Sequence, residues 1–67
     1  MLAKRLATSV KKQRTHVRWT QEQAAEAIGI TTRNYQLIEG GHVNCTLRTV
    51  ERICEAFGVD AVQLFTK

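Results

Sequence analysis

The segment that most constrains the fold runs from Thr20 to Gly41 and reads TQEQAAEAIGITTRNYQLIEGG. Thr20 is a favourable helix N-cap, and Gln23 follows three residues later, so this spacing predicts a capping box at the start of a helix. Gly29 can adopt the left-handed backbone conformation that ends such a helix. The first half of the segment is therefore expected to form a short helix that closes in a tight turn.

The second half of the segment predicts another short helix. Thr31 or Thr32 is its N-cap, and Gly40–Gly41 marks its end. Tyr35 and Ile38 are three residues apart, which places both on the side that faces the core. Two helices of about two to three turns joined at a glycine are typical of a helix-turn-helix motif.

The whole chain favours a small all-α protein. Its 67 residues contain no proline and are expected to form a single domain over residues 1–67. Helices are expected at residues 2–15, 20–28, 31–39 and 46–57, with a short fifth helix from residue 60 onward. No apolar run approaches the roughly 18 residues of a membrane-spanning helix, and the N-terminus has no signal-peptide pattern, so a cytoplasmic protein without membrane contact is expected.

The first expected helix carries one apolar stripe. Leu2, Leu6 and Val10 recur at every fourth position. The next position on this stripe is Arg14, and a guanidinium at the edge of a core needs a partner because burying it unpaired is costly. The alternative is that the helix frays before this point and Arg14 is solvated.

Two further sets of apolar residues are expected to complete the core. Val17 and Trp19 lie in the connection before the capping box, and both are expected to pack inward. The expected fourth helix has an apolar stripe with helical spacing, formed by Leu47, Val50, Ile53, Cys54 and Phe57.

The whole chain has a net charge of +4, and its positive charge is concentrated in the first third. Residues 1–20 contain six basic residues and no acidic residue, whereas the remainder contains four basic residues and all six acidic ones. Such a one-sided distribution favours a polyanionic partner. A solvated helix face explains the charges equally well, so charge alone leaves both interpretations open.

Cys45 and Cys54 are expected to be free thiols. If residue 54 lies in a helix that begins near residue 46, their Cα atoms are roughly 12–14 Å apart, whereas a disulfide requires less than about 7 Å. Together with His16 and His42, the cysteines show none of the spacings of a structural zinc site. No metal, cofactor or enzymatic activity is therefore expected.

Landmarks along the whole chain carry a family resemblance. They are Arg14, Thr20, Gln21, Ala25, Gly29, Ile30, Ile38, Glu39, Gly41, Thr46, Leu47 and the segment Ala56–Val59. In this set the chain resembles the Cro/repressor-type helix-turn-helix family, the lambda-repressor-like DNA-binding domains of phage and bacterial regulators. The resemblance implies a compact five-helix domain that acts as a sequence-specific transcriptional regulator, with the helix at about residues 31–39 in the major groove of double-stranded DNA.

The resemblance also implies roles for individual residues. The expected base-reading side chains are Thr32, Arg33, Gln36 and Leu37. The expected contacts to DNA phosphates come from Thr20, Gln21, Thr31, Asn34, His42, Asn44 and Arg48. A structural ion pair between Arg14 and Glu39 is implied as well, and it supplies the partner that the apolar stripe requires.

A homodimer on a palindromic operator is expected, because one recognition helix reads few base pairs and a second copy about 34 Å along the duplex adds specificity. The last expected helix supplies the dimer surface through Val62, Leu64 and Phe65. Repression by occupying the operator is the simplest mode of action. The alternative is an antitoxin that binds a partner protein and represses its own operon, which an exposed Leu37 and the apolar C-terminal helix favour.

Four positions depart from the family pattern, and one of them is Cys45, which stands where the family commonly has proline. Ala24 stands where the family usually has leucine, and Tyr35 stands where it usually has a branched aliphatic residue. We expect the large Tyr35 to fill the volume that Ala24 leaves, which conserves core packing. Leu37 occupies a site that is often polar, which weakens the case for base reading at that position.

Overall fold

The computed structural model describes residues 2–43, 45–60, 62 and 64. Among these residues the protein contains four α-helices, α1 (Leu2–His16), α2 (Gln21–Ile28), α3 (Thr32–Glu39) and α4 (Leu47–Phe57). The all-α class and the positions of these four helices agree with the sequence-based prediction. The side chain of Leu2 lies outside the described part of the structure.

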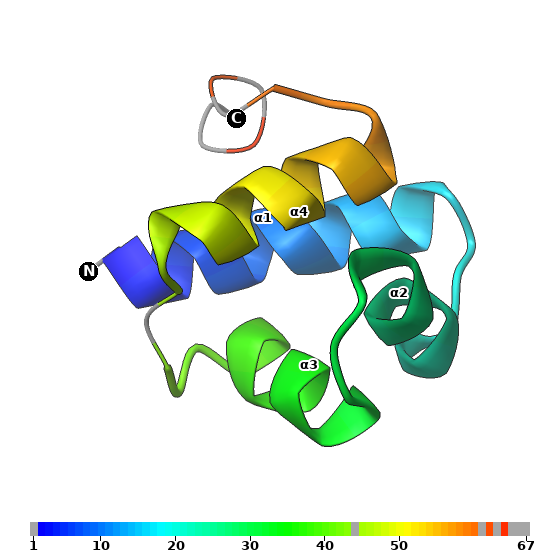
Figure 1. The fold of residues 1–67 in the computed structure, drawn as a ribbon, viewed down its shortest axis with the longest axis horizontal. Coiled ribbons are helices and arrows are strands. Elements are labelled where there is room, and N and C mark those ends of the chain that lie inside the picture. The colour runs from blue at the N-terminus through cyan, green and yellow to red at the C-terminus, as the bar shows by residue number, and fades with distance from the viewer. Residues whose placement is uncertain (1, 44, 61, 63, 65–67) are drawn as a thin grey trace.

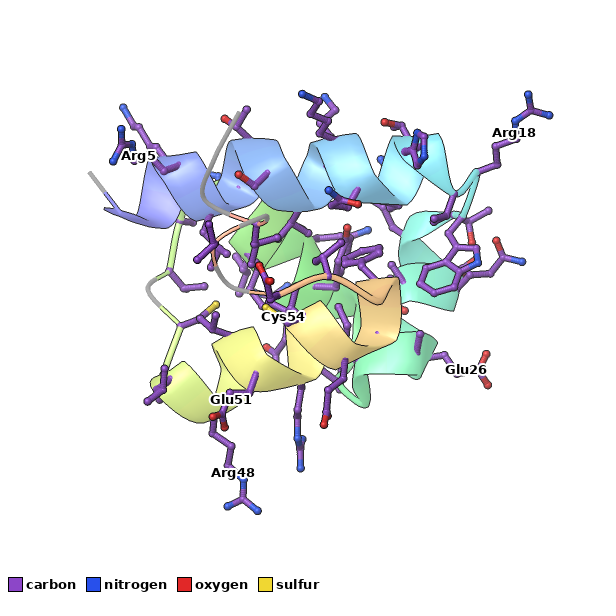
Figure 2. The ribbon with its side chains drawn as sticks, turned by 90° about the horizontal axis from the view of Figure 1, so that it is seen from above. Arg5, Arg18, Glu26, Arg48, Glu51 and Cys54 are labelled. Carbon is purple, nitrogen blue, oxygen red and sulfur yellow. The ribbon has the colours of Figure 1, made fainter. Side chains whose placement is uncertain are left out.

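The helices surround a common core. In Figure 1, α1 and α4 run across the upper part of the molecule, and α2 and α3 lie below them. When the molecule is seen from above, α1 and α4 lie on opposite sides of this core (Figure 2). The α3 helix packs against both α1 and α2, while α2 also packs against α4. This arrangement holds the two helices of the helix-turn-helix segment on a common base and leaves one side of α3 free.

Threonine caps begin three of the helices. Thr20, Thr31 and Thr46 precede α2, α3 and α4, and each hydroxyl oxygen accepts a hydrogen bond of 3.0–3.2 Å from the backbone N–H three residues later. The predicted capping box at Thr20 and Gln23 is confirmed, since the Gln23 side chain accepts from the Thr20 N–H at 2.8 Å. Of the two candidate caps of α3, Thr31 is the one used.

All four helices end in the same hydrogen-bonded motif. After each last turn, one residue has a left-handed backbone, and the next N–H donates to the carbonyl five residues back at 3.0–3.1 Å. Glycine occupies the left-handed position after α2, α3 and α4, but Arg18 occupies it after α1 with φ 61°. A side chain in this conformation costs roughly 1–2 kcal/mol. The connection after α1 is therefore the strained one.

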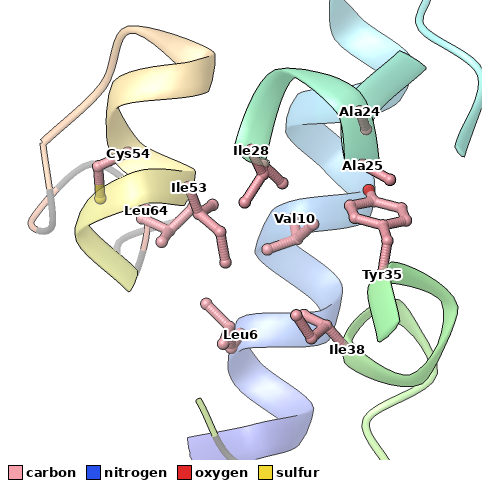
Figure 3. Packing of buried hydrophobic residues seen from close by; sticks show 10 residues of the cluster. All are labelled: Leu6, Val10, Ala24, Ala25, Ile28, Tyr35, Ile38, Ile53, Cys54 and Leu64. Atoms are coloured by element: carbon pink, nitrogen blue, oxygen red, sulfur yellow. The ribbon is translucent and has the colours of Figure 1, made fainter. Parts of the chain in front are cut away.

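The core lies between the helices, and each of α1, α2, α3 and α4 contributes side chains to it (Figure 3). Tyr35 and Ala24 are both completely buried and belong to the same cluster, and the compensation of volume between them stays a prediction. Half-buried Trp19 packs against the edge of this core, and the centroid of its ring lies 5.5 Å from the centroid of the Phe57 ring. The buried cluster consists of Leu6, Val10, Ala24, Ala25, Ile28, Tyr35, Ile38, Ile53, Cys54 and Leu64.

The expectation of five helices is wrong for the described residues. After α4, Val62 and Leu64 are helical, and the Leu64 N–H donates to the Asp60 carbonyl at 3.0 Å, but residues 61, 63 and 65–67 lie outside the described residues. Leu64 is buried, with 1% of it exposed. Leu64 therefore cannot belong to a dimer surface, because it closes the core of its own chain. Val62 is 72% exposed and Phe65 lies outside the described residues.

Two other expected core residues are exposed instead. Leu47 follows the apolar stripe of α4, but it is the first residue of the helix and is 75% exposed. Helical side chains point toward the N-terminus, so at the first residue the side chain extends beyond the end of the core. Val17 is 37% exposed because it lies in the turn after α1 rather than on its buried side.

The strained turn after α1 predicts a stabilising substitution. Arg18→Gly should raise the stability by about 0.5–1 kcal/mol, because relief of the left-handed conformation exceeds the entropy that glycine adds to the unfolded chain. A melting temperature several degrees higher would report this gain. Arg18→Ala removes the same charge but keeps the strain, so an equal rise in that variant would contradict the explanation.

Candidate nucleic-acid interface

The side chain of Glu39, the last residue of α3, is the centre of a hydrogen-bond network. Arg14 in α1 donates to both of its oxygens, from Nε to Oε2 at 2.6 Å and from Nη2 to Oε1 at 3.1 Å. The exposed fractions of the two side chains are 16% for Arg14 and 6% for Glu39. A two-pronged arginine contact fixes both the position and the plane of a carboxylate. The expected ion pair is therefore present, and Arg14 is not merely solvated.

Two more donors reach the same carboxylate. The hydroxyl of Tyr35 donates to Oε2 at 2.6 Å, and Nε2 of Gln21 donates to Oε1 at 2.9 Å. Arg14 uses its remaining terminal nitrogen, Nη1, to donate to the carbonyl of Trp19 at 2.9 Å. The network thus joins α1, the first residue of α2, two turns of α3 and the connection between α1 and α2.

The protonation states in this network reinforce one another. Burial alone would raise the pKa of Glu39, but hydrogen bonds from Arg14, Tyr35 and Gln21 outweigh it and hold the pKa below its ordinary value. The hydrogen bond to Glu39 raises the pKa of Arg14. Burial and the neighbouring carboxylate raise the pKa of Tyr35. At neutral pH the carboxylate is therefore ionised and accepts every one of these bonds.

The four expected base-reading residues lie along one side of α3, away from its buried side. Arg33 and Gln36 are exposed, whereas Thr32 and Leu37 are half-buried. Thr32 and Gln36, and likewise Arg33 and Leu37, are four residues apart, so each pair lies on one face of the helix. Gln36 also donates from Nε2 to Oε1 of Gln21 at 3.3 Å, so the start of α2 and the exposed side of α3 are in contact.

The residues expected to contact phosphates lie at the starts of α2, α3 and α4 and in the loop after α3. Thr20 and Thr31 are exposed at the N-termini of α2 and α3, where their hydroxyls already cap the helices. Asn34 and Arg48 are exposed in the first turns of α3 and α4. Asn44 lies outside the described residues. Helix N-termini carry partial positive charge, which suits these positions to an anion.

The loop after α3 packs closely on its neighbours. The His42 ring lies against Gly40, where an added Cβ would be 2.7 Å from its Cδ2 atom. A Cβ on Gly41 would lie 3.5 Å from Cγ of Lys4 and 3.6 Å from Cβ of Ala7. The loop is thus held against the N-terminal half of α1, and it brings exposed His42 to the same region as Lys4.

A basic groove runs beside this loop. One wall is formed by α1, from which Lys4, Lys11 and Lys12 line the groove, and the other by the segment 39–41, whose acidic residue Glu39 is already paired with Arg14. All three lysines are exposed. Because the loop that forms the second wall directly follows α3, the positive charge of α1 continues the surface around that helix.

Positive and mixed charge lie on different sides of the molecule. In Figure 2, Arg5 and Arg18 project from the α1 side, while Arg48 and Glu51 project from the α4 side. The α1 side carries the excess of positive charge, whereas α4 alternates basic and acidic residues. A polyanion is therefore attracted mainly to the α1 side and to the groove beside it.

The two cysteines are free thiols, and Cys54 is buried while Cys45 is half-buried. Burial raises the pKa of both thiols, and Asp60 and Glu51 raise that of Cys54 further. Thiols in such surroundings are protonated and poor nucleophiles at neutral pH. Across the described residues, no group of three or more possible metal ligands gathers. Within the same part of the chain, no helix has the length and apolar character that crossing a membrane requires.

Sequence reasoning missed two donors of the Glu39 network. Tyr35 was expected only to fill volume, and Gln21 only to face phosphate. The separation of four residues between Tyr35 and Glu39 was a usable signal, because such pairs are neighbours on a helix surface. The contact of Gln21 joins separate helices, and no local sequence pattern indicates it.

A family model described as a helix-turn-helix domain matches residues 5–64 of the chain. The protein belongs to the helix-turn-helix domain family. The match spans all four helices except the first residues of α1, and α2 and α3 with Gly29 between them form the motif itself. DNA binding and transcription regulation fit this family. None of the curated proteins matches the chain.

The buried carboxylate of this helix-turn-helix domain predicts an acid-sensitive contribution to stability. Glu39→Gln should lower the free energy of unfolding at pH 7 by about 3 kcal/mol, because Arg14 is left without its counter-charge. Since the native pKa of Glu39 lies below its unfolded value of about 4.3, the contribution is complete above that pH. It is lost as the pH falls through the lower native pKa.

Urea unfolding of the natural protein and the Glu39→Gln variant between pH 7 and pH 3 measures this difference. The gap between their stabilities should narrow only below about pH 4. Glu26→Gln is a suitable control, because this carboxylate is exposed in α2. A stability difference between the two proteins that stays constant down to pH 3 would show that the ionised Glu39 carboxylate is not its source.

Proposed function

We propose that this protein is a sequence-specific transcriptional regulator that represses by binding a palindromic operator as a homodimer. The observation that carries the proposal is the exposed side of α3, where Arg33 and Gln36 project from a helix whose far end is anchored by Glu39. A helix held in this way can enter the major groove without first becoming ordered, which favours specific binding.

The residue types on α3 suit the edges of base pairs. Arg33 can donate two hydrogen bonds to O6 and N7 of guanine. The half-buried Leu37 can meet a thymine methyl group with the part of its side chain that remains accessible. Thr32, at the first turn of α3, can donate to or accept from either kind of base pair. These assignments give Arg33 the largest part in discrimination.

Phosphate contacts are assigned to the groups around α3. Gln21, Thr31 and Asn34 lie at the starts of α2 and α3, and His42 and Arg48 lie beyond the other end of α3. Such contacts fix the register of the protein on the duplex and carry no sequence information themselves. The basic groove on α1 adds attraction that weakens with salt.

Dimeric binding follows from the small size of one recognition surface. An eight-residue helix contacts only a few base pairs, so two copies on a two-fold symmetric site add specificity. Of the residues first assigned to the dimer surface, Val62 remains exposed. Repression requires only that the bound dimer occupy DNA that the transcription machinery also needs.

An antitoxin role is the second candidate. Leu47 and Val62 are 75% and 72% exposed, and large exposed apolar side chains suit a protein partner. Leu37 gives less support than expected because it is half-buried. An antitoxin of this kind would still bind DNA through α3, so both candidates share the experiment below.

The proposed function predicts the outcome of an unbiased duplex selection at two salt concentrations. The natural protein should enrich a palindrome with half-sites about 34 Å apart. Arg33→Ala should lose preference at one base pair in each half-site and weaken specific binding by roughly 1–3 kcal/mol. Arg52→Ala is the matched control, since it removes the same charge from an exposed position on α4. Binding without any enriched sequence would contradict the proposal.

The α1 groove predicts a separate effect on salt dependence. Lys11→Gln should reduce the slope of log affinity against log salt by about 1 and leave the enriched sequence unchanged, because a phosphate contact is lost. Titrations between about 50 and 200 mM salt measure the slope. Lys11→Arg keeps the charge and should retain the natural slope. An unchanged slope in Lys11→Gln would place the groove outside the DNA interface.

A further inference from the structure

We infer that Glu39 and Gln21 are positioning residues that orient Gln36 for reading adenine. The three side chains form a continuous chain of hydrogen bonds. Gln21 donates from Nε2 to Glu39 Oε1 at 2.9 Å, and Gln36 donates from Nε2 to Gln21 Oε1 at 3.3 Å. The inference rests on the proposed DNA binding and adds which base one residue reads and how its orientation is set.

The direction of every bond in this chain follows from the charge on Glu39. An ionised carboxylate has no proton to donate, so the Gln21 side chain must turn its NH2 group toward it. The Oε1 atom of Gln21 then points outward. Because a carbonyl oxygen only accepts, Gln36 must in turn present its own NH2 group. Neither amide can flip without placing two acceptors together.

The carboxylate that sets this direction is itself fixed. Arg14 holds it with two hydrogen bonds, and the hydroxyl of Tyr35 adds a third at 2.6 Å. Tyr35 is completely buried, and only 6% of the Glu39 side chain is exposed. The chain of bonds therefore starts at a carboxylate held by several donors beside the core and ends at an exposed residue of α3.

The groups that remain on Gln36 match one base. After donating to Gln21, its amide keeps Oε1 as an acceptor and one N–H as a donor. Adenine presents the complementary pair in the major groove, with N6–H2 as donor and N7 as acceptor. Guanine presents two acceptors at the same edge, so it cannot satisfy Oε1 of Gln36. An oriented Gln36 thus favours adenine.

A duplex selection with Gln36→Ala and Gln21→Ala tests the inference. The natural protein should prefer adenine about tenfold or more at one position of each half-site, and Gln36→Ala should abolish this preference. Gln21→Ala should abolish it as well, although Gln21 touches no base. Combining the substitutions should remove no further discrimination, because both act through one contact.

Gln23→Ala is the matched control. This glutamine lies in the same turn of α2 and closes the capping box, so its loss affects stability without touching the chain of bonds. Adenine preference should survive in it. Thermal unfolding of each variant establishes that the comparison is made between folded proteins.

The outcomes separate the inference from the function on which it rests. If Gln21→Ala weakens binding evenly but keeps the full adenine preference, Gln21 is only a phosphate contact and the inference is overturned. If Gln36→Ala changes no base preference, Gln36 reads no base and the inference is also overturned. If the natural protein enriches no sequence, both the inference and the proposed function are overturned.

Discussion

The carboxylate of Glu39 accepts hydrogen bonds from α1, α2 and α3, and the geometry of the helix-turn-helix depends on it. Replacing a buried ion pair by apolar residues is often neutral for stability, so the pair is better understood as fixing an arrangement. Helices α2 and α3 have eight residues each, too few to be stable alone. Packing against the rest of the protein stabilises α2 and α3, and the hydrogen-bond network fixes their orientation relative to α1.

The polar network and the apolar core meet at Tyr35. Its side chain is completely buried in the core cluster, and its hydroxyl donates to Glu39 at 2.6 Å. A branched aliphatic residue would fill part of the same volume but leave one acceptor position of a buried carboxylate unused. Tyr35 therefore does more than fill volume in the core. It connects core packing to the ion pair that aligns α3.

Local signals made most of the fold predictable from the sequence. The caps at Thr20 and Thr46 and the helix end at Gly29 depend on neighbouring residues, so they could be placed from spacing alone. The burial of Leu64 could not, because it depends on the path of the chain after α4 over a core built by other helices. The left-handed backbone of Arg18 was not predictable in this way, because glycine is the usual signal for that conformation and arginine is not. The exposed side of α3 was predictable from periodicity, whereas the contact between Gln21 and Gln36 joins two helices whose relative placement no local pattern gives.

Affinity and discrimination are assigned to different elements of this protein. The first third of the chain carries most of the positive charge, whereas α3 has one basic residue, Arg33, and one acidic residue that is already paired. Charges on α1 attract phosphate whatever the sequence, but the attraction acts over only about 8 Å at physiological salt. In the proposed complex, with a duplex on α3, the α1 residues that border the loop after α3 are the ones best placed to act on it. Lys4 is such a residue because it lies against Gly41, so the proposal brings attraction and base reading together at the boundary between α1 and α3.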